Sequence, residues 1–168
     1  MSFSHSLRSV DRPRIVTERL VLEPVRPDWA AAVVAGRLDG LDGLVPGAGW
    51  PHADTVDGLR LTLDHGGGAL GWFLTLDGVV VGDCGTHGPT DPDGVVEIGY
   101  GLAGPFRGRG LATEAVAAMT EFLLGAAGGR RVVASTHAAA NPVSRRVLAK
   151  CGFTLDRLDG EIAWYSRP

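Results

Sequence analysis

Arg107-Gly108-Arg109-Gly110-Leu111-Ala112 is the stretch that decides the fold, because it places two glycines directly before a predicted helix. Glycines in that position let main-chain N–H groups converge, and the unpaired donors and dipole of a helix N-terminus favour an anion. Each such contact contributes about 0.3–1 kcal/mol. No Gly-Lys-Ser/Thr follows, so this is not a Walker loop, and the spacing differs from the Rossmann fingerprint. The stretch predicts either a phosphate-binding loop or an ordinary connection that caps a helix.

A strand is predicted before this loop and an amphipathic helix after it. The turn at residues 89–94 leads into a strand over Val95 to Tyr100. After the loop, apolar residues repeat on one helical face, and Gly128-Gly129 is expected to end the helix. These apolar residues are Ala112, Ala115, Val116, Met119 and Leu123. The loop therefore joins a strand to a helix.

The segments on either side add strands and helices to this unit. Residues 72–76 and 79–82 read as a hairpin around Asp77-Gly78, a pair typical of a type I′ turn. A strand is predicted over residues 131–136, and Asn141-Pro142 starts a last helix that ends at Gly152. One or two strands are expected within residues 153–165.

The N-terminal part is predicted as a flexible leader over residues 1–14, followed by a strand over residues 15–25. Asp28 is the expected cap of a helix to Ala35, and Asp54 or Thr55 that of a helix ending at the triple glycine 66–68. The stretch 36–49 reads as loop. The whole indicates one α+β domain over residues 15–168, with a mixed central sheet flanked by helices.

Composition excludes several classes of protein. The 168 residues are 45% hydrophobic and 21% charged, as in a globular domain, and the net charge of −3 disfavours nucleic-acid binding. Cys84 and Cys151 form neither a disulfide framework nor a zinc motif, and we expect both to be inert core residues. No apolar run reaches the roughly 20 residues of a membrane span, and no signal peptide is evident. We therefore expect a cytoplasmic protein without membrane or nucleic-acid partners.

Three further motifs give the loop a family context. The loop matches the Arg/Gln-x-x-Gly-x-Gly/Ala signature of the GNAT acetyltransferase superfamily. Residues 96–100 resemble that family's fourth strand, and Asn141 to Phe153 resembles its last helix followed by Gly-Phe. Residues 17–22, Thr-Glu-Arg-Leu-Val-Leu, resemble the start of the Rim branch, which includes acetyltransferases of ribosomal-protein N-termini. The resemblance spans roughly residues 15 to 155.

This resemblance implies acetyl coenzyme A as co-substrate, with no metal. The pyrophosphate would lie on the amides of residues 108–112 and against Thr113. The pantetheine arm would lie between the fourth and fifth strands, beside Tyr100 to Leu102, where the N–H of Gly101 or Leu102 would polarise the thioester. Asn141 would contact the pantetheine, cap its helix, or do both. The implied cofactor-binding residues are Gly101, Leu102, Arg107, Gly108, Arg109, Gly110, Leu111, Ala112, Thr113, Asn141 and Ser144.

Acetyl transfer to an amine also needs a base and an acid. Glu97 matches the position of a glutamate that deprotonates the amine through water in several family members; the alternative is a solvated surface charge. The tyrosine that many members carry on the last helix is replaced here by Leu148. Ser144, one turn earlier, resembles the Rim pattern in which a serine hydrogen-bonds the thiol sulfur, and Tyr100 is the alternative proton donor.

Two functions follow. The first is acetyl transfer to a primary amine, a protein N-terminus or a small molecule, by direct attack in a ternary complex. The second is a coenzyme A-binding sensor or scaffold without turnover, which the loss of the tyrosine at Leu148 keeps open. Trp50-Pro51-His52 lies where the family builds acceptor specificity, and Trp50 is expected in the core or as an aromatic lid. The resemblance also allows a homodimer and leaves the amine, the acyl group and the oligomeric state open.

Overall fold

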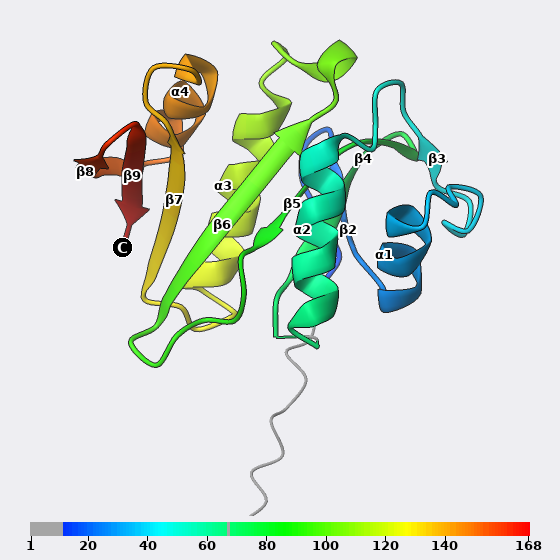
Figure 1. The fold of residues 1–168 in the computed structure, drawn as a ribbon, viewed down its shortest axis with the longest axis horizontal. Coiled ribbons are helices and arrows are strands. Elements are labelled where there is room, and N and C mark those ends of the chain that lie inside the picture. Colours follow the sequence, from blue (N-terminus) through cyan, green and yellow to red (C-terminus); the bar gives the residue numbers. More distant parts are fainter. Residues whose placement is uncertain (1–11, 67) are drawn as a thin grey trace, which may run out of the picture.

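The computed structural model describes residues 12–66 and 68–168. Most of the leader expected at residues 1–14, namely residues 1–11, lies outside the described residues, as does Gly67. The described chain forms a mixed sheet with helices on both faces (Figure 1). This is the α+β architecture that the sequence predicts.

The sheet has the strand order β1-β2-β4-β5-β6-β7-β9-β8, and the short β3 pairs with β5. Two pairs are parallel, β6 with β7 and β3 with β5, and the others are antiparallel. The strands are β1 (Ile15–Val16), β2 (Val21–Pro24), β3 (Val45–Pro46), β4 (Gly71–Leu76), β5 (Val79–Thr86), β6 (Val95–Leu102), β7 (Arg131–His137), β8 (Thr154–Asp159) and β9 (Ile162–Arg167).

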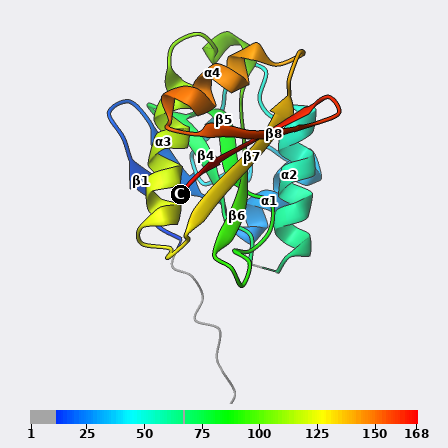
Figure 2. The ribbon, with the colours of Figure 1, turned by 90° about the vertical axis from the view of Figure 1, so that its left-hand side faces the viewer.

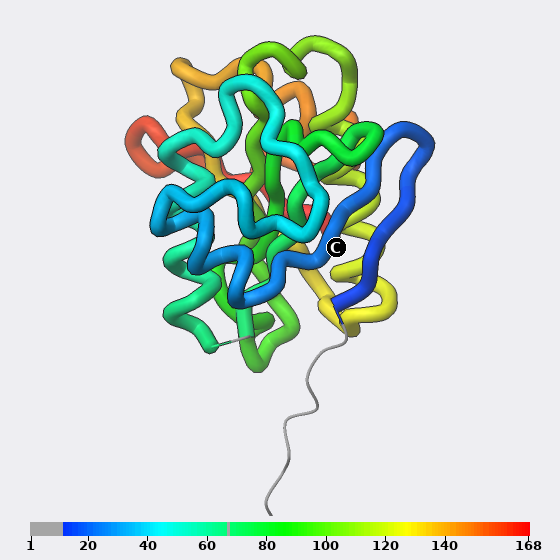
Figure 3. The backbone as a smooth tube through the Cα atoms, turned by 90° about the vertical axis from the view of Figure 1, so that its right-hand side faces the viewer, coloured from blue at the N-terminus to red at the C-terminus, as the bar shows by residue number. Residues whose placement is uncertain are grey.

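Helices cover the two faces of the sheet in pairs, as Figure 2 shows. On one face the helices α3 (Leu111–Leu124) and α4 (Pro142–Lys150) pack on a large apolar cluster that includes Trp72 and Met119. On the other, α1 (Pro27–Val34) and α2 (Ala53–Asp64) enclose a smaller cluster around Phe73. Figure 3 faces α1 and the segment that leads from it to α2. Because successive strand residues point to opposite faces, both clusters take residues from β4.

The predicted turn and helix-cap residues lie at the turn and the helix ends that the sequence indicates. Asp77 and Gly78 have φ of 50° and 78° between β4 and β5, as a type I′ turn requires. Asn141 Oδ1 accepts a hydrogen bond from the N–H of Ser144 at 3.1 Å and caps α4. Gly152, with φ of 83°, follows the end of that helix. These local predictions are confirmed.

Five local predictions are wrong in detail. The strand expected over residues 15–25 is interrupted, because a turn in which Thr17 N–H donates to the carbonyl of Leu20 separates β1 from β2. Asp28 lies in the first turn of α1, whose N-cap is Arg26. His52, rather than Asp54 or Thr55, caps α2. The helix α3 ends at Gly125, before Gly128-Gly129, and the short β3 interrupts the expected loop 36–49.

Candidate functional site

Two parallel strands separate at the centre of the sheet and open a gap. β6 pairs with β7 only over residues 95–98 and 131–134, although both strands continue beyond (Figure 1). On its other side β6 stays paired with β5, where Ala103 N–H donates to Val81 and His87 N–H donates to Glu97. In an antiparallel ladder alternate residues face the partner, so Gly101 bonds to β5. The main-chain groups of Tyr100 and Leu102 therefore face the gap.

The carbonyl of Leu102 is already used, because it accepts a hydrogen bond from Arg107 Nε at 3.0 Å. Its N–H is thus the main-chain donor at the open end of β6. Of the two donors that the sequence left open, Gly101 and Leu102, the register favours Leu102.

The loop before α3 presents a second set of donors. Gly108 and Gly110 have φ of 77° and 76°, a left-handed conformation that side chains rarely adopt, and Gly110 is the N-cap of α3. The carbonyl of Gly110 accepts from Glu114 N–H, so the amides of Leu111 to Thr113 have no partner within the helix. An anion at this place would meet three converging N–H groups and the positive end of the helix dipole.

The gap, this loop and α4 line one cavity of about 870 Å³. Arg107, Arg146 and Lys150 give its wall a positive charge, against the single carboxylate of Asp54. Arg109 is not in the wall, since its guanidinium lies over the ring of Phe106 at 5.7 Å. The cavity brings together these residues expected at the site: Tyr100, Gly101, Leu102, Arg107, Gly108, Gly110, Leu111, Ala112, Thr113, Asn141 and Ser144. We call it the cofactor cavity.

The N-terminal turn braces the loop from outside the cavity. Glu114 Oε1 accepts from Thr17 Oγ1 and from Arg19 N–H, both at 2.7 Å, and Arg19 Nε donates to Oε2 at 2.8 Å. Arg19 Nη1 also donates to the carbonyl of Arg109 at 2.7 Å. Burial raises the pKa of Glu114, but these hydrogen bonds outweigh it and hold the pKa below its ordinary value. The sequence had given residues 17–19 no role at the site.

Two hydroxyl groups meet in the cofactor cavity. The Tyr100 hydroxyl lies 2.7 Å from Ser144 Oγ and also donates to the Ser144 carbonyl at 3.2 Å. Burial raises the pKa of Tyr100 to about 12, so this hydroxyl keeps its proton at neutral pH. Leu148, on the next turn of α4, is fully buried in the core. The two alternative proton donors of the sequence are thus one hydrogen-bonded pair.

Glu97 lies apart from this pair and lines neither this cavity nor the second one described below. Its Oε1 is 3.3 Å from His87 Nδ1 and accepts a hydrogen bond from Ser135 Oγ at 3.4 Å. The contact with His87 lowers the pKa of Glu97. A carboxylate with a lowered pKa is a weaker proton acceptor.

A second cavity, of about 240 Å³, lies between α2 and the sheet. It meets the cofactor cavity at His52, Asp54, Tyr100 and Gly101, which line both. Asp54 and Asp83 line it as carboxylates, and among the described residues of its wall there is no lysine or arginine. We call it the acceptor cavity, after the role proposed for it below. Charge is thus divided between the two cavities, positive in the first and negative in the second.

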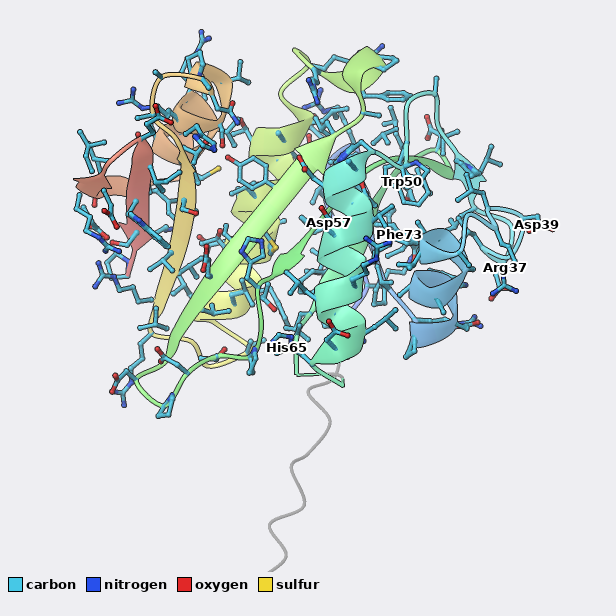
Figure 4. All side chains as sticks on the ribbon, viewed as in Figure 1. Arg37, Asp39, Trp50, Asp57, His65 and Phe73 are labelled. Atoms are coloured by element: carbon cyan, nitrogen blue, oxygen red, sulfur yellow. The ribbon has the colours of Figure 1, made fainter. Side chains whose placement is uncertain are left out.

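Asp83 is the most enclosed charge of the acceptor cavity. Its Oδ2 accepts hydrogen bonds from Thr55 Oγ1 at 2.6 Å and Trp50 Nε1 at 2.9 Å. Burial raises the pKa of Asp83 despite these two donors. Trp50 is itself 4% exposed and meets Phe73 edge to face at 4.9 Å (Figure 4), so it is a core residue and not a lid.

His52 stands at the junction of the two cavities. Its Nδ1 accepts a hydrogen bond from Thr55 N–H at 3.3 Å, which places the ring proton on Nε2. Nε2 is buried and has no hydrogen-bond partner among the described residues. The ring lies against Gly101, where a Cβ would come within 2.9 Å of it. The sequence analysis placed residues 50–52 in a specificity region, with Trp50 in the core or as a lid, and missed the hydrogen bond from Trp50 to Asp83.

The remaining candidates of the sequence play no part in either cavity wall, except for Cys84. Cys84 and Cys151 are buried, and burial raises the pKa of each thiol, so both are poor nucleophiles. His137 is exposed at the end of β7. No group of three or more side chains that could hold a metal ion occurs within residues 12–66 and 68–168. None of the helices in the described part of the chain is both long and apolar enough to cross a bilayer.

Comparison with known proteins gives a consistent family. A family model described as acetyltransferase (GNAT) domain matches residues 19–154. The structure is similar to Mycobacterium smegmatis RimJ in complex with a CoA disulfide, with a TM-score of 0.66 and 27% identity over 93% of this chain and 87% of that one. It is also similar to an acetyltransferase from Agrobacterium tumefaciens, with a TM-score of 0.65 and 26% identity over 93% and 94% of the two chains. No curated protein sequence matches significantly.

Proposed function

The chain belongs to the GNAT acetyltransferase family and resembles its Rim-like branch, and from that premise we propose that it transfers an acetyl group from acetyl coenzyme A to a primary amine. The amine attacks the thioester directly, within a ternary complex. We propose no covalent acetyl-enzyme, because both buried cysteines have raised pKa values and the described residues of the two cavity walls include no other strong nucleophile.

The residues of the cofactor cavity fit acetyl coenzyme A, which supplies an activated thioester. The amides of residues 111–113 and the positive φ of Gly108 and Gly110 suit the pyrophosphate. Arg146 and Lys150 are free to pair with further phosphate charge in the same cavity. The unpaired N–H of Leu102 is the donor to the thioester carbonyl, whose oxygen gains negative charge during attack.

The division of charge between the two cavities supports a primary amine as the acceptor. A primary amine arrives mostly as an ammonium ion at neutral pH. The acceptor cavity offers two carboxylates and no lysine or arginine among its described residues, whereas the cofactor cavity is lined by three cations. Each substrate therefore meets charge of the opposite sign, and the cavities join at Gly101, beside the N–H of Leu102. The volume of the acceptor cavity, about 240 Å³, suits a small amine or the amine end of a longer molecule.

The hydroxyl pair of Tyr100 and Ser144 is the proton donor to the departing sulfur. Both hydroxyls keep their protons at neutral pH, and they lie in the gap between β6 and β7. Replacement of the family tyrosine by Leu148 then removes no chemistry, since Leu148 points into the core. Glu97 remains the base that the sequence favours, and it would act through water because it lines neither cavity.

A thiol-release assay tests this function. Acetyl coenzyme A at a fixed concentration is mixed with small primary amines and with peptides that carry a free α-amino group. We expect thiol release above background for at least one class, and the favoured class identifies the acceptor. Tight binding of acetyl coenzyme A without thiol release for any amine would instead indicate the coenzyme A-binding sensor.

A further inference from the structure

We propose that Asp83 binds the ammonium group of the acceptor in the acceptor cavity and accepts its proton, so that Asp83 rather than Glu97 is the catalytic base. This inference rests on the proposed acetyl transfer to an amine. It begins with how the carboxylate is held. Thr55 and Trp50 both donate to Oδ2, while Oδ1 receives no hydrogen bond from the described residues. Since Asp83 lines the acceptor cavity, Oδ1 is the oxygen available to a ligand.

The sheet register brings this carboxylate to the reacting centre. Asp83 is the direct cross-strand partner of Gly101, and the two side-chain positions lie on the same face of the sheet. His52 packs against Gly101 on that face, and Leu102 is the next residue. An amine bound to Oδ1 thus lies beside the place where the two cavities meet and where the thioester carbonyl is polarised.

His52 and Asp83 differ in what they can do with a proton. The hydrogen bond from Thr55 N–H occupies the Nδ1 lone pair of His52, so its buried Nε2 is a donor and not a base. Of His52 and Asp83, only Asp83 can accept a proton. This assigns the base to the carboxylate and leaves Nε2–H of His52 for an oxygen of the substrates.

Other titratable groups face the same cavity and set the pH at which Asp83 gains its proton. Asp54 faces it from α2 and His52 from the N-cap of that helix. Tyr100 faces it from β6, His87 from just after β5, and Cys84 is the neighbour of Asp83 on β5. Burial has the largest effect on the pKa of Asp83 and raises it. The hydrogen bonds from Thr55 and Trp50 lower it, and repulsion from Asp54 raises it. A carboxylate with a raised pKa is a better base near neutral pH.

The proposed step balances in atoms and charge. The ammonium gives one proton to Oδ1 of Asp83, and the freed nitrogen lone pair forms the C–N bond to the acetyl carbon. The C–S bond breaks, and the sulfur takes a proton from the Tyr100–Ser144 pair, which is refilled from solvent. The nitrogen loses its second proton to solvent, and Asp83 releases the first one to solvent as well. Since one proton is taken up to refill the Tyr100–Ser144 pair, one proton is released per turnover.

The test compares three variants that each remove one carboxylate. Asp83→Asn keeps an oxygen for Thr55 and Trp50 but cannot accept the proton. Asp54→Asn removes the other carboxylate of the cavity, and Glu97→Gln removes the alternative base. We expect Asp83→Asn to lower kcat about 10²–10⁴-fold, with the acetyl coenzyme A affinity unchanged. Asp54→Asn should mainly raise the acceptor KM, and Glu97→Gln should lose far less kcat than Asp83→Asn. Near-normal turnover of Asp83→Asn, or the large loss in Glu97→Gln instead, would overturn the proposal.

A second variant guards against a purely structural effect. Thr55→Val removes one donor to Oδ2, and loss of that hydrogen bond raises the pKa of Asp83 further. The acid limb of the kcat/KM profile should therefore move to higher pH in Thr55→Val and disappear in Asp83→Asn. An acid limb that stays in place in both variants would contradict a role for Asp83 as base. Failure of wild type to acetylate any amine would instead refute the proposed function itself.

Discussion

Adding one methyl group at Gly101 should damage the reacting centre through His52. In Gly101→Ala the new Cβ would lie 2.9 Å from Cε1 and 3.0 Å from Nε2 of His52, closer than the 3.4 Å at which ordinary contact begins. The backbone of Gly101 is not in the left-handed region, so the effect is steric alone. The ring must therefore move by about half an ångström.

That movement has two measurable consequences. His52 Nδ1 caps α2 at 3.3 Å, and weakening this cap costs about 1 kcal/mol, or roughly 2–4 °C in Tm for a chain of this size. Misplacement of a group beside the reacting atoms by a fraction of an ångström should lower kcat about 10–10²-fold. Thermal denaturation measures the change in Tm, and thiol release with a reactive amine measures the change in kcat.

Gly104→Ala is the matched control, because no atom lies within 4 Å of its Cβ position and its φ is not positive. We expect it to match wild type in both assays. If Gly101→Ala and Gly104→Ala behave alike, His52 does not stand where the two cavities meet, and the reasoning is wrong.

Three further outcomes follow from the same geometry. Arg19→Ala releases the carbonyl of Arg109 and leaves Glu114 without its cation, so acetyl coenzyme A affinity should fall about tenfold in calorimetry, while acceptor KM stays constant. Gly58→Ala adds a methyl with no atom within 4 Å in the middle of α2; it should stabilise the fold by about 0.5–1 kcal/mol and change acceptor KM but not the affinity for acetyl coenzyme A. The pKa of Asp83 is raised in the folded protein, so Asp83 stabilises the fold fully at a pH below its unfolded-state pKa, and this stabilisation is lost as pH rises through its folded-state pKa. In urea titrations, Asp83→Asn should therefore become more stable relative to wild type as pH increases above about 4.

Much of the fold follows from local signals in the sequence. Asp77-Gly78 and Asn141-Pro142 specify a turn and a cap by their own conformational preferences. Gly108 and Gly110 specify the donor loop for the same reason. Such features depend on residues adjacent in sequence, which explains why the cofactor cavity is lined by most of the residues that the sequence named for it.

The acceptor side depends on contacts between distant segments, and there sequence reasoning fell short. Strand alternation puts Glu97 and Gly101 on one face of β6, but it does not say what packs on that face. Trp50 and Thr55 reach Asp83 only because α2 and the residues before it pack across β5. Likewise, Arg19 meets Glu114 across a large sequence separation. The one sequence signal for Asp83 is that it is the single charged residue within the strand Val79–Thr86, and this signal is weak.

The most direct test of the central claim is product analysis by mass spectrometry with a matched pair of acceptors. A primary amine and its N,N-dimethyl analogue are each incubated with the protein and acetyl coenzyme A, the first able to form a stable amide and the second not. The account predicts one acetyl group on the primary amine, formed in step with free coenzyme A, and no product from the dimethyl analogue. An acetylated protein side chain as the sole product, or no acetylated amine at all from a panel that spans small amines and N-terminal peptides, would contradict it.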